Sequence, residues 1–171
     1  MAEVNLLVTF DPVHKQSAKT EIENIIKEAG EKAKIEKIEE GLVEIKTSNA
    51  KKIIKKIIDI AKKDIDKFNY TFNWWPVDKW CKSEIKDMQK AISEIEKNIK
   101  ETEKWKMDFS KRKTDKDYGK DIIIKLTEVV DKPKVDLNKP DKTIKVEIIG
   151  DKAAISLIAK GESLNVPNFK K

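Results

Sequence analysis

The chain is poor in cysteine, histidine and glycine. Its 171 residues include one cysteine, Cys81, and one histidine, His14, which excludes an internal disulfide and a Cys/His zinc cluster. The five glycines are dispersed, at positions 30, 41, 119, 150 and 161, so there is no phosphate-binding loop, dinucleotide fingerprint or GxxG clamp. We therefore expect a protein that is not an enzyme and that holds no cofactor and no metal.

Long hydrophobic runs are also absent. No stretch approaches the roughly 18 to 20 apolar residues of a membrane span. The opening segment, MAEVNLLVTFDP, reaches Asp11 and Pro12 before the apolar core of a signal peptide could develop. The sequence predicts a cytoplasmic protein without a membrane partner, and its 39% hydrophobic content is enough for one ordinary domain or two small ones.

Charge is abundant and unevenly placed. Charged residues make up 40% of the chain, with a net charge of +6. Residues 1 to 75 carry 14 basic and 13 acidic side chains, whereas residues 76 to 171 carry 23 and 18. The positive excess of the second part favours a polyanionic partner through the release of counterions.

The first 75 residues follow the hydrophobic periodicities of a βαββαβ unit, the ferredoxin-like arrangement. The expected elements are a strand over 4–10, a helix from a Ser17 cap to Gly30, a hairpin turning at Gly41, a helix capped by Ser48, and a strand over 70–75. We expect a ferredoxin-like domain over residues 1–75.

Pro76 begins a second α/β pattern, which predicts a domain over residues 76–171 and an α+β protein as a whole. Its expected elements are an amphipathic helix over 82–102, a strand in EKWKMDF with alternate residues buried, a helix capped by Asp117, a short strand and proline turn in KVDLNKPD, and a hairpin turning at Gly150 and Asp151.

Arg112 is the only arginine, against 36 lysines, and it stands between Lys111 and Lys113 in MDFSKRKTDK. A guanidinium offers a planar fork of donors that fits a phosphate or a guanine edge, which an ammonium cannot match. The alternative is an accident of composition in a surface loop. Because the strand ends at the buried Phe109 in this interpretation, we expect Arg112 to lie beyond it in a cationic loop.

Two further features have competing interpretations. Trp74, Trp75 and Trp80 in NWWPVDKWC could stack on unpaired bases, or they could fix one domain against the other by burying a large surface. Cys81 stands near an expected helix start, where a thiolate is stabilised, so it is either a nucleophile or a packed core residue. His14 is expected to be an ordinary loop residue.

The second part resembles a known family. WPVDKWC before a long helix, WKMDFSKRK before a second helix, VDLNKPD, KVEIIGDKAAISLI and LNVPNF are similar to the THUMP domain, and specifically to small stand-alone adaptors for tRNA cytidine acetylation. The resemblance covers residues 76 to 171, and the first 75 residues match the family in architecture. Here the stretch before the proline-cysteine motif is aromatic, whereas in the family it is commonly basic.

The resemblance implies a function. Such adaptors bind tRNA, not DNA, and present it to a separate RNA cytidine acetyltransferase, which uses acetyl coenzyme A and ATP to form N4-acetylcytidine. The family's lysine-arginine pair falls on Lys111 and Arg112. The candidate RNA-binding residues are Lys106, Lys111, Arg112, Lys113, Lys116 and Lys139.

Two other functions compete with the adaptor. The first is an RNA-binding subunit of another tRNA modification system, for thiolation or methylation. The second is a small enzyme that uses Cys81 or clustered carboxylates.

Overall fold

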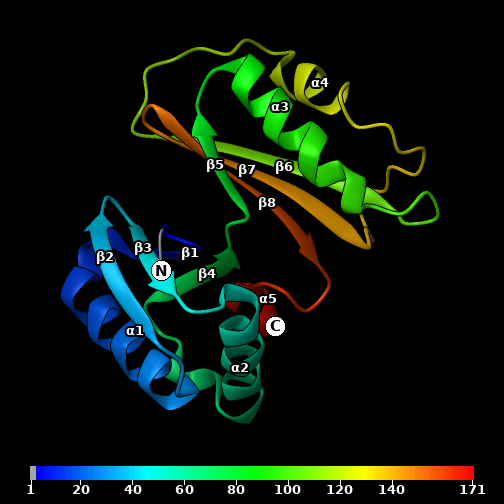
Figure 1. The fold of residues 1–171 in the computed structure, drawn as a ribbon. Coiled ribbons are helices and arrows are strands. Elements are labelled where there is room, and N and C mark those ends of the chain that lie inside the picture. Colours follow the sequence, from blue (N-terminus) through cyan, green and yellow to red (C-terminus); the bar gives the residue numbers. More distant parts are fainter. Residues whose placement is uncertain (1–2) are drawn as a thin grey trace. The chain divides into compact units, whose positions relative to one another are not determined.

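The structure is a computed structural model that describes residues 3–171 (Figure 1). It contains two compact units, each described here by itself: the chain up to Pro76 with Gly161–Lys171, and Val77–Lys160. The strands are β1 (Leu6–Phe10), β2 (Ala33–Glu39), β3 (Leu42–Thr47), β4 (Thr71–Pro76), β5 (Lys79–Lys82), β6 (Trp105–Arg112), β7 (Lys142–Ile149), β8 (Lys152–Ala159) and β9 (Leu164–Asn165). The α-helices are α1 (Lys15–Ala29), α2 (Ala50–Lys63), α3 (Ile85–Ile95), α4 (Ile122–Thr127) and α5 (Val166–Phe169), with 3-10 turns at Pro12–His14, Ile65–Lys67 and Glu96–Asn98.

The first unit has a five-stranded sheet in the order β2-β3-β1-β4-β9, with β1 antiparallel to both β3 and β4. Isoleucines of α1 and α2, among them Ile22, Ile25, Ile53 and Ile57, pack with residues of β1 and β3 in one buried cluster. The order β1-α1-β2-β3-α2-β4 confirms the predicted βαββαβ unit.

The predicted helix starts in this unit were wrong by one to a few residues. Asp11 accepts the N–H of Val13 and begins a 3-10 turn that runs directly into α1, so Ser17 lies inside the helix. Asn49, rather than Ser48, caps α2 by accepting the N–H of Lys52 over 3.1 Å. Ser48 and Asn49 are adjacent residues of similar capping chemistry, and the backbone geometry selects Asn49.

The C-terminal segment joins the first unit. Asn165 and Leu164 of β9 pair with Asn73 and Trp74 of β4, and Gly161–Lys171 groups with the chain up to Pro76. The sequence predicts a second domain over residues 76–171, whereas the compact second unit extends from Val77 to Lys160.

The second unit is a four-stranded sheet in the order β5-β8-β7-β6, with α3 and α4 on one face (Figure 1). The hairpin of β7 and β8 at Gly150 and Asp151 is confirmed. β6 pairs with β7 in parallel. Trp105 and Met107 of β6 lie in the core beneath α3 and α4, as their alternation predicted.

Three predicted elements of the second unit differ from the structure. The helix expected over 82–102 is α3 followed by a 3-10 turn that ends at Asn98, and Lys82 of the expected range is the last residue of strand β5, which pairs with β8. α4 begins at Ile122, and Asp117 instead accepts the N–H of Gly119 over 2.9 Å. In KVDLNKPD, Val135 forms only an isolated parallel bridge with Trp105.

Trp74 anchors the first unit internally. Its side chain is fully buried in the cluster between sheet and helices, and its indole N–H donates to the Thr71 hydroxyl over 3.0 Å. Its ring is therefore not available to stack on a base. Trp80 belongs to the second unit, where the Lys152 ammonium lies 4.5 Å from its ring centroid.

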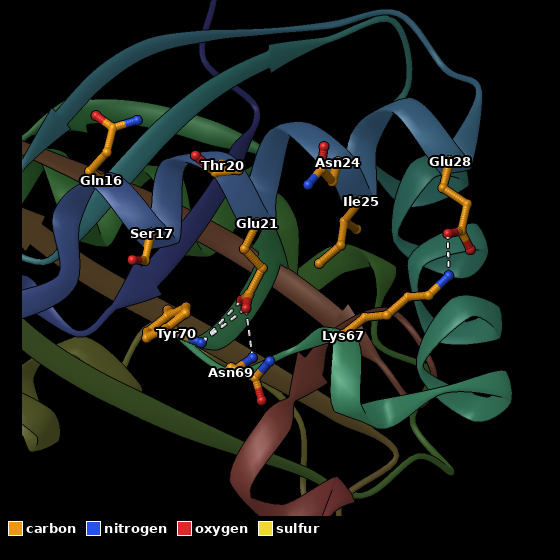
Figure 2. A pocket seen from close by; sticks show the side chains of 10 residues that line it. All are labelled: Gln16, Ser17, Thr20, Glu21, Asn24, Ile25, Glu28, Lys67, Asn69 and Tyr70. Atoms are coloured by element: carbon orange, nitrogen blue, oxygen red, sulfur yellow. Dashed lines mark hydrogen bonds and ion pairs between the residues drawn. The ribbon is translucent and has the colours of Figure 1, made fainter.

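Glu21 ties α1 to the start of β4. Its carboxylate is 8% exposed and accepts hydrogen bonds from the backbone N–H groups of Asn69, Tyr70 and Thr71, over 2.6, 3.0 and 3.0 Å. Figure 2 shows this carboxylate pointing from the helix toward that segment. Three backbone donors that would otherwise lack a partner are satisfied by one side chain.

Replacing Glu21 by glutamine is expected to lower the free energy of unfolding by about 1–3 kcal/mol, since the new amide N–H₂ would face backbone donors. Urea unfolding measures the change. The matched control is Glu23→Gln on the exposed side of the same helix, which should shift stability by no more than about 0.5 kcal/mol. Equal stabilities of the two variants would contradict the assignment.

Candidate nucleic-acid interface

Arg112 is the last residue of β6, not part of a loop beyond it. Parallel pairing with β7 continues to the partners Arg112 and Ile149. The backbone N–H of Gly150 then donates to the Arg112 carbonyl oxygen over 2.9 Å. The expectation that Arg112 lies beyond the strand was wrong, because the turn after β7 extends the pairing that the buried residues of β6 begin.

The Arg112 side chain lies beside a buried acid. Successive strand residues alternate between faces, so Arg112 and Ser110 point away from the face that carries Met107. Glu147 of β7, directly opposite Ser110, is 2% exposed. It accepts a hydrogen bond from Ser110 Oγ over 2.6 Å, and Arg112 Nε lies 3.7 Å from its Oε2. The single arginine thus has a partner in the fold.

The chain after β6 folds back onto the start of α3. Lys116 Nζ donates to the Glu84 carboxylate over 2.6 Å and to Ser83 Oγ over 3.2 Å. The Tyr118 hydroxyl donates to the Ser83 carbonyl oxygen over 2.6 Å, and Lys111 Nζ donates to the Lys116 carbonyl oxygen over 2.7 Å. Lys111 and Lys116 are therefore held in one ordered group at the carboxyl end of β6.

Lys113 redirects the chain at this point. Its φ of 57° is in the left-handed region, which a lysine adopts rarely and at a cost of roughly 1–2 kcal/mol. The position directly follows the last paired residue of β6. The turn takes the chain out of the sheet, toward the group formed by Lys116 and Tyr118.

Acidic side chains partly neutralise these cations. Among the described residues, Lys106 pairs with Asp108 at 3.5 Å, Arg112 with Glu147 at 3.7 Å and Lys116 with Glu84 at 2.6 Å. The hydrogen bond to Glu84 raises the pKa of Lys116, so that side chain stays charged at neutral pH. The excess of positive charge at this end of the sheet is modest.

The six candidate residues do not form one cluster. Lys111, Arg112, Lys113 and Lys116 lie at the carboxyl end of β6. Lys139 lies in the segment that leads into β7, where its backbone N–H donates to the Asp136 carboxylate over 3.0 Å. That segment adjoins the start of β6, roughly 23 Å from Arg112 at the usual strand rise. Contact with both ends requires a ligand that spans the strand.

The structure gives no support to catalysis by Cys81. The thiol lies in β5, packed against the core beneath α3, and not at a helix start. Burial, with a smaller contribution from the charge of Asp87, raises its pKa to about 11. His14 Nδ1 lies 2.8 Å from the Asp11 carboxylate, and this hydrogen bond lowers the pKa of Asp11. Across residues 3–171, no three His, Cys, Asp or Glu side chains are grouped as metal ligands.

A hollow of about 570 Å³ lies in the first unit, between α1 and the chain before β4 (Figure 2). Its floor includes Glu21, whose carboxylate is already occupied by backbone donors. At one end, Lys67 pairs with Glu28 over 2.5 Å. These charged groups of the hollow therefore form contacts within the fold, to backbone N–H groups and to one another.

Comparison with protein families identifies the second unit. Residues 82–158 match the family model of the THUMP domain. The chain contains a THUMP domain. This segment starts at the end of β5 and includes β6, β7 and nearly all of β8, so the cationic group around Arg112 belongs to the THUMP domain. A search of curated proteins found no match.

Solved structures share the fold of both units. PH1313 from Pyrococcus horikoshii is 18% identical, with a TM-score of 0.61, over 91% of this chain and 55% of that one. A 4-thiouridine synthetase, solved as an RNA complex with bound ATP, is 14% identical, with a TM-score of 0.55 over 95% and 42%. A possible methylase from Clostridium difficile is 16% identical, with a TM-score of 0.58 over 94% and 42%. The chain spans about half the length of these proteins.

Glu147, Ser83 and Tyr118 contribute contacts that the sequence alone does not predict. The first carried a signal: an acid between Val146 and Ile148 in an apolar strand is unusual and needs a partner. Nothing in the local sequence marks Ser83 or Tyr118, since their contact joins segments 35 residues apart. The residues of Lys134–Leu157 that support the family resemblance lie inside the matched range.

We expect Cys81 to be unreactive at neutral pH. With a pKa of about 11, the thiolate fraction, and hence the alkylation rate, should be on the order of a hundredfold below that of a free cysteine. Iodoacetamide labelling followed by mass spectrometry measures the rate at this single thiol, and the urea-unfolded protein is the control. Equal rates in folded and unfolded protein would contradict the buried assignment.

Among the helices that the structure describes, none is both long and apolar enough to cross a lipid bilayer.

Proposed function

We propose that this protein is a tRNA-binding adaptor that presents tRNA to a separate RNA cytidine acetyltransferase. The observation that carries the proposal is the THUMP domain, whose sheet brings Lys111, Arg112, Lys113 and Lys116 together at the end of β6. A nucleic acid is the partner that such a group fits, because ammonium and guanidinium groups neutralise phosphates. tRNA is the class that the family resemblance implies.

The acetylation role rests on the resemblance of the quoted motifs to the stand-alone adaptor family. The half-buried Cys81, whose pKa is raised to about 11, fits a protein without its own chemistry. In this proposal the catalytic centre, acetyl coenzyme A and ATP belong to the partner enzyme, and the present chain contributes tRNA binding.

A second candidate is an RNA-binding subunit of a thiolation or methylation system. It is favoured by the similarity to a 4-thiouridine synthetase bound to RNA and to a possible methylase. Each match covers 42% of that protein.

The purified protein is expected to bind folded tRNA with an affinity that falls steeply as salt rises, with a log–log slope of about −0.7 to −0.9 for each phosphate neutralised. Duplex DNA of matched length should bind more weakly, because 2′-hydroxyl and shape contacts distinguish RNA. Fluorescence anisotropy at several salt concentrations measures both. Equal affinity for the two nucleic acids at physiological salt would count against the proposal.

In the same assay, Arg112→Lys keeps the charge but loses the fork, and should cost about 1–3 kcal/mol of binding free energy. Lys116→Ala should cost less and should mainly flatten the salt dependence. Thermal melts check that both variants are folded. Wild-type affinity of Arg112→Lys would reduce the role of Arg112 to charge alone.

Incubation of the protein with tRNA, acetyl coenzyme A and ATP should yield no N4-acetylcytidine until the acetyltransferase is added. Mass spectrometry of the digested nucleosides detects the product. Product formed without the acetyltransferase would refute the adaptor role. A stimulation of thiolation or methylation, but not of acetylation, by the corresponding enzyme would favour the second candidate.

A further inference from the structure

Glu147 is a buried acid in the interior of a sheet. It lies on β7, which has β6 on one side and β8 on the other, and its side chain is 2% exposed. A carboxylate in such a place is stable only when it is paired and hydrogen bonded. Ser110 Oγ donates to its Oε2 over 2.6 Å, and the guanidinium of Arg112 provides the compensating charge.

The contact with Glu147 leaves the two terminal amino groups of the Arg112 guanidinium without a hydrogen bond in the part of the chain that the structure describes. Nε is the guanidinium atom nearest Glu147, at 3.7 Å, and it is buried and makes no hydrogen bond. The two terminal amino groups make no hydrogen bond with any residue from 3 to 171, and the side chain is 26% exposed. Glu147 therefore holds the charge of Arg112 in place without occupying the donors that would meet a ligand.

We infer that Glu147 is a positioning residue for RNA recognition. It holds the Nε side of Arg112, and Ser110 fixes the carboxylate that does so. The two terminal amino groups of Arg112 then donate together to one phosphate of the RNA backbone, the bidentate geometry that a guanidinium fork favours. The inference rests on the proposed function, since it assigns a role within the same interface.

Charge alone predicts the opposite effect of removing this acid. A carboxylate near the interface repels phosphate, so its neutralisation should strengthen RNA binding. A positioning residue behaves differently, because without it the guanidinium samples other orientations and pays the entropy of ordering when RNA binds. The sign of the change in affinity therefore separates the two roles.

The test is a double-mutant cycle on tRNA binding with Glu147→Gln, Arg112→Lys and the double variant. Glutamine keeps the size of glutamate and an oxygen that accepts from Ser110. Glu147→Gln should weaken binding by about three- to tenfold when Arg112 is present, and by less than about twofold in the Arg112→Lys background. The matched control is Glu84→Gln, which neutralises the exposed partner of Lys116 and should leave binding unchanged or strengthen it.

A spectroscopic readout examines the contact without RNA. Since Arg112 is the only arginine, its Nε–H gives a single NMR signal free of overlap. Its hydrogen exchange should be several-fold faster in Glu147→Gln than in the unchanged protein, because the Nε–H, now buried, becomes accessible to water once the side chain is no longer held. Ser110→Ala, at an exposed position, should give a smaller change in the same direction, and it serves if Glu147→Gln fails to fold in a thermal melt.

The outcomes are distinct. Weaker binding by Glu147→Gln only when Arg112 is present, together with faster Nε–H exchange, supports the positioning role. Unchanged or stronger binding by Glu147→Gln, while Arg112→Lys binds more weakly, overturns that role and leaves the proposed function standing. An unchanged protein that binds no tRNA overturns the proposed function and the role of Glu147 with it.

Discussion

The parallel pairing of β6 with β7 decides where the charged groups of the THUMP domain lie. Parallel neighbours cannot be joined by a tight turn, so the chain must cross over from the end of one strand to the start of the next. Here the crossover is residues 113–141, including α4. It leaves β6 beside Arg112, so the cations at its beginning gather at that end of the sheet. It finishes before Lys142, which places Lys139 at the opposite end.

The same pairing creates the polar contact at the interface. Ser110 and Glu147 are cross-strand partners, and Arg112 lies one pleat further along β6 on the same face. A shift of the pairing by one residue would turn Glu147 toward the apolar core beneath α3 and α4, where the carboxylate would have no polar partner. The buried acid thus favours the observed register, and the register in turn fixes the position of the arginine.

Most elements of the fold could be predicted because the spacing of apolar residues within each segment indicates a helix or a strand. Isoleucines at helical spacing gave α1 and α2, and the alternation of Trp105, Met107 and Phe109 gave β6. Properties that depend on distant partners were not accessible in this way. β5 forms because it pairs with the edge of β8, a strand about 70 residues further along the chain, and it takes Lys82 from the start of the expected helix. The Ser110–Glu147–Arg112 contact required the strand register, which no single segment of the sequence contains.

Under the proposed function, the pairing of these cations with acids affects how the candidate interface binds RNA. Lys116 and Arg112 each lie beside a carboxylate, so their charges contribute less to long-range attraction than those of isolated cations would. In its proposed role Glu147 provides order, since an arginine held in one orientation loses less entropy on meeting a phosphate. In the proposed function, phosphate neutralisation supplies the affinity that salt weakens. The oriented guanidinium adds a geometric contribution, which favours discrimination among RNA shapes. The proposed adaptor role fits that combination, because contacts that depend on shape can be released once a catalytic partner binds the RNA.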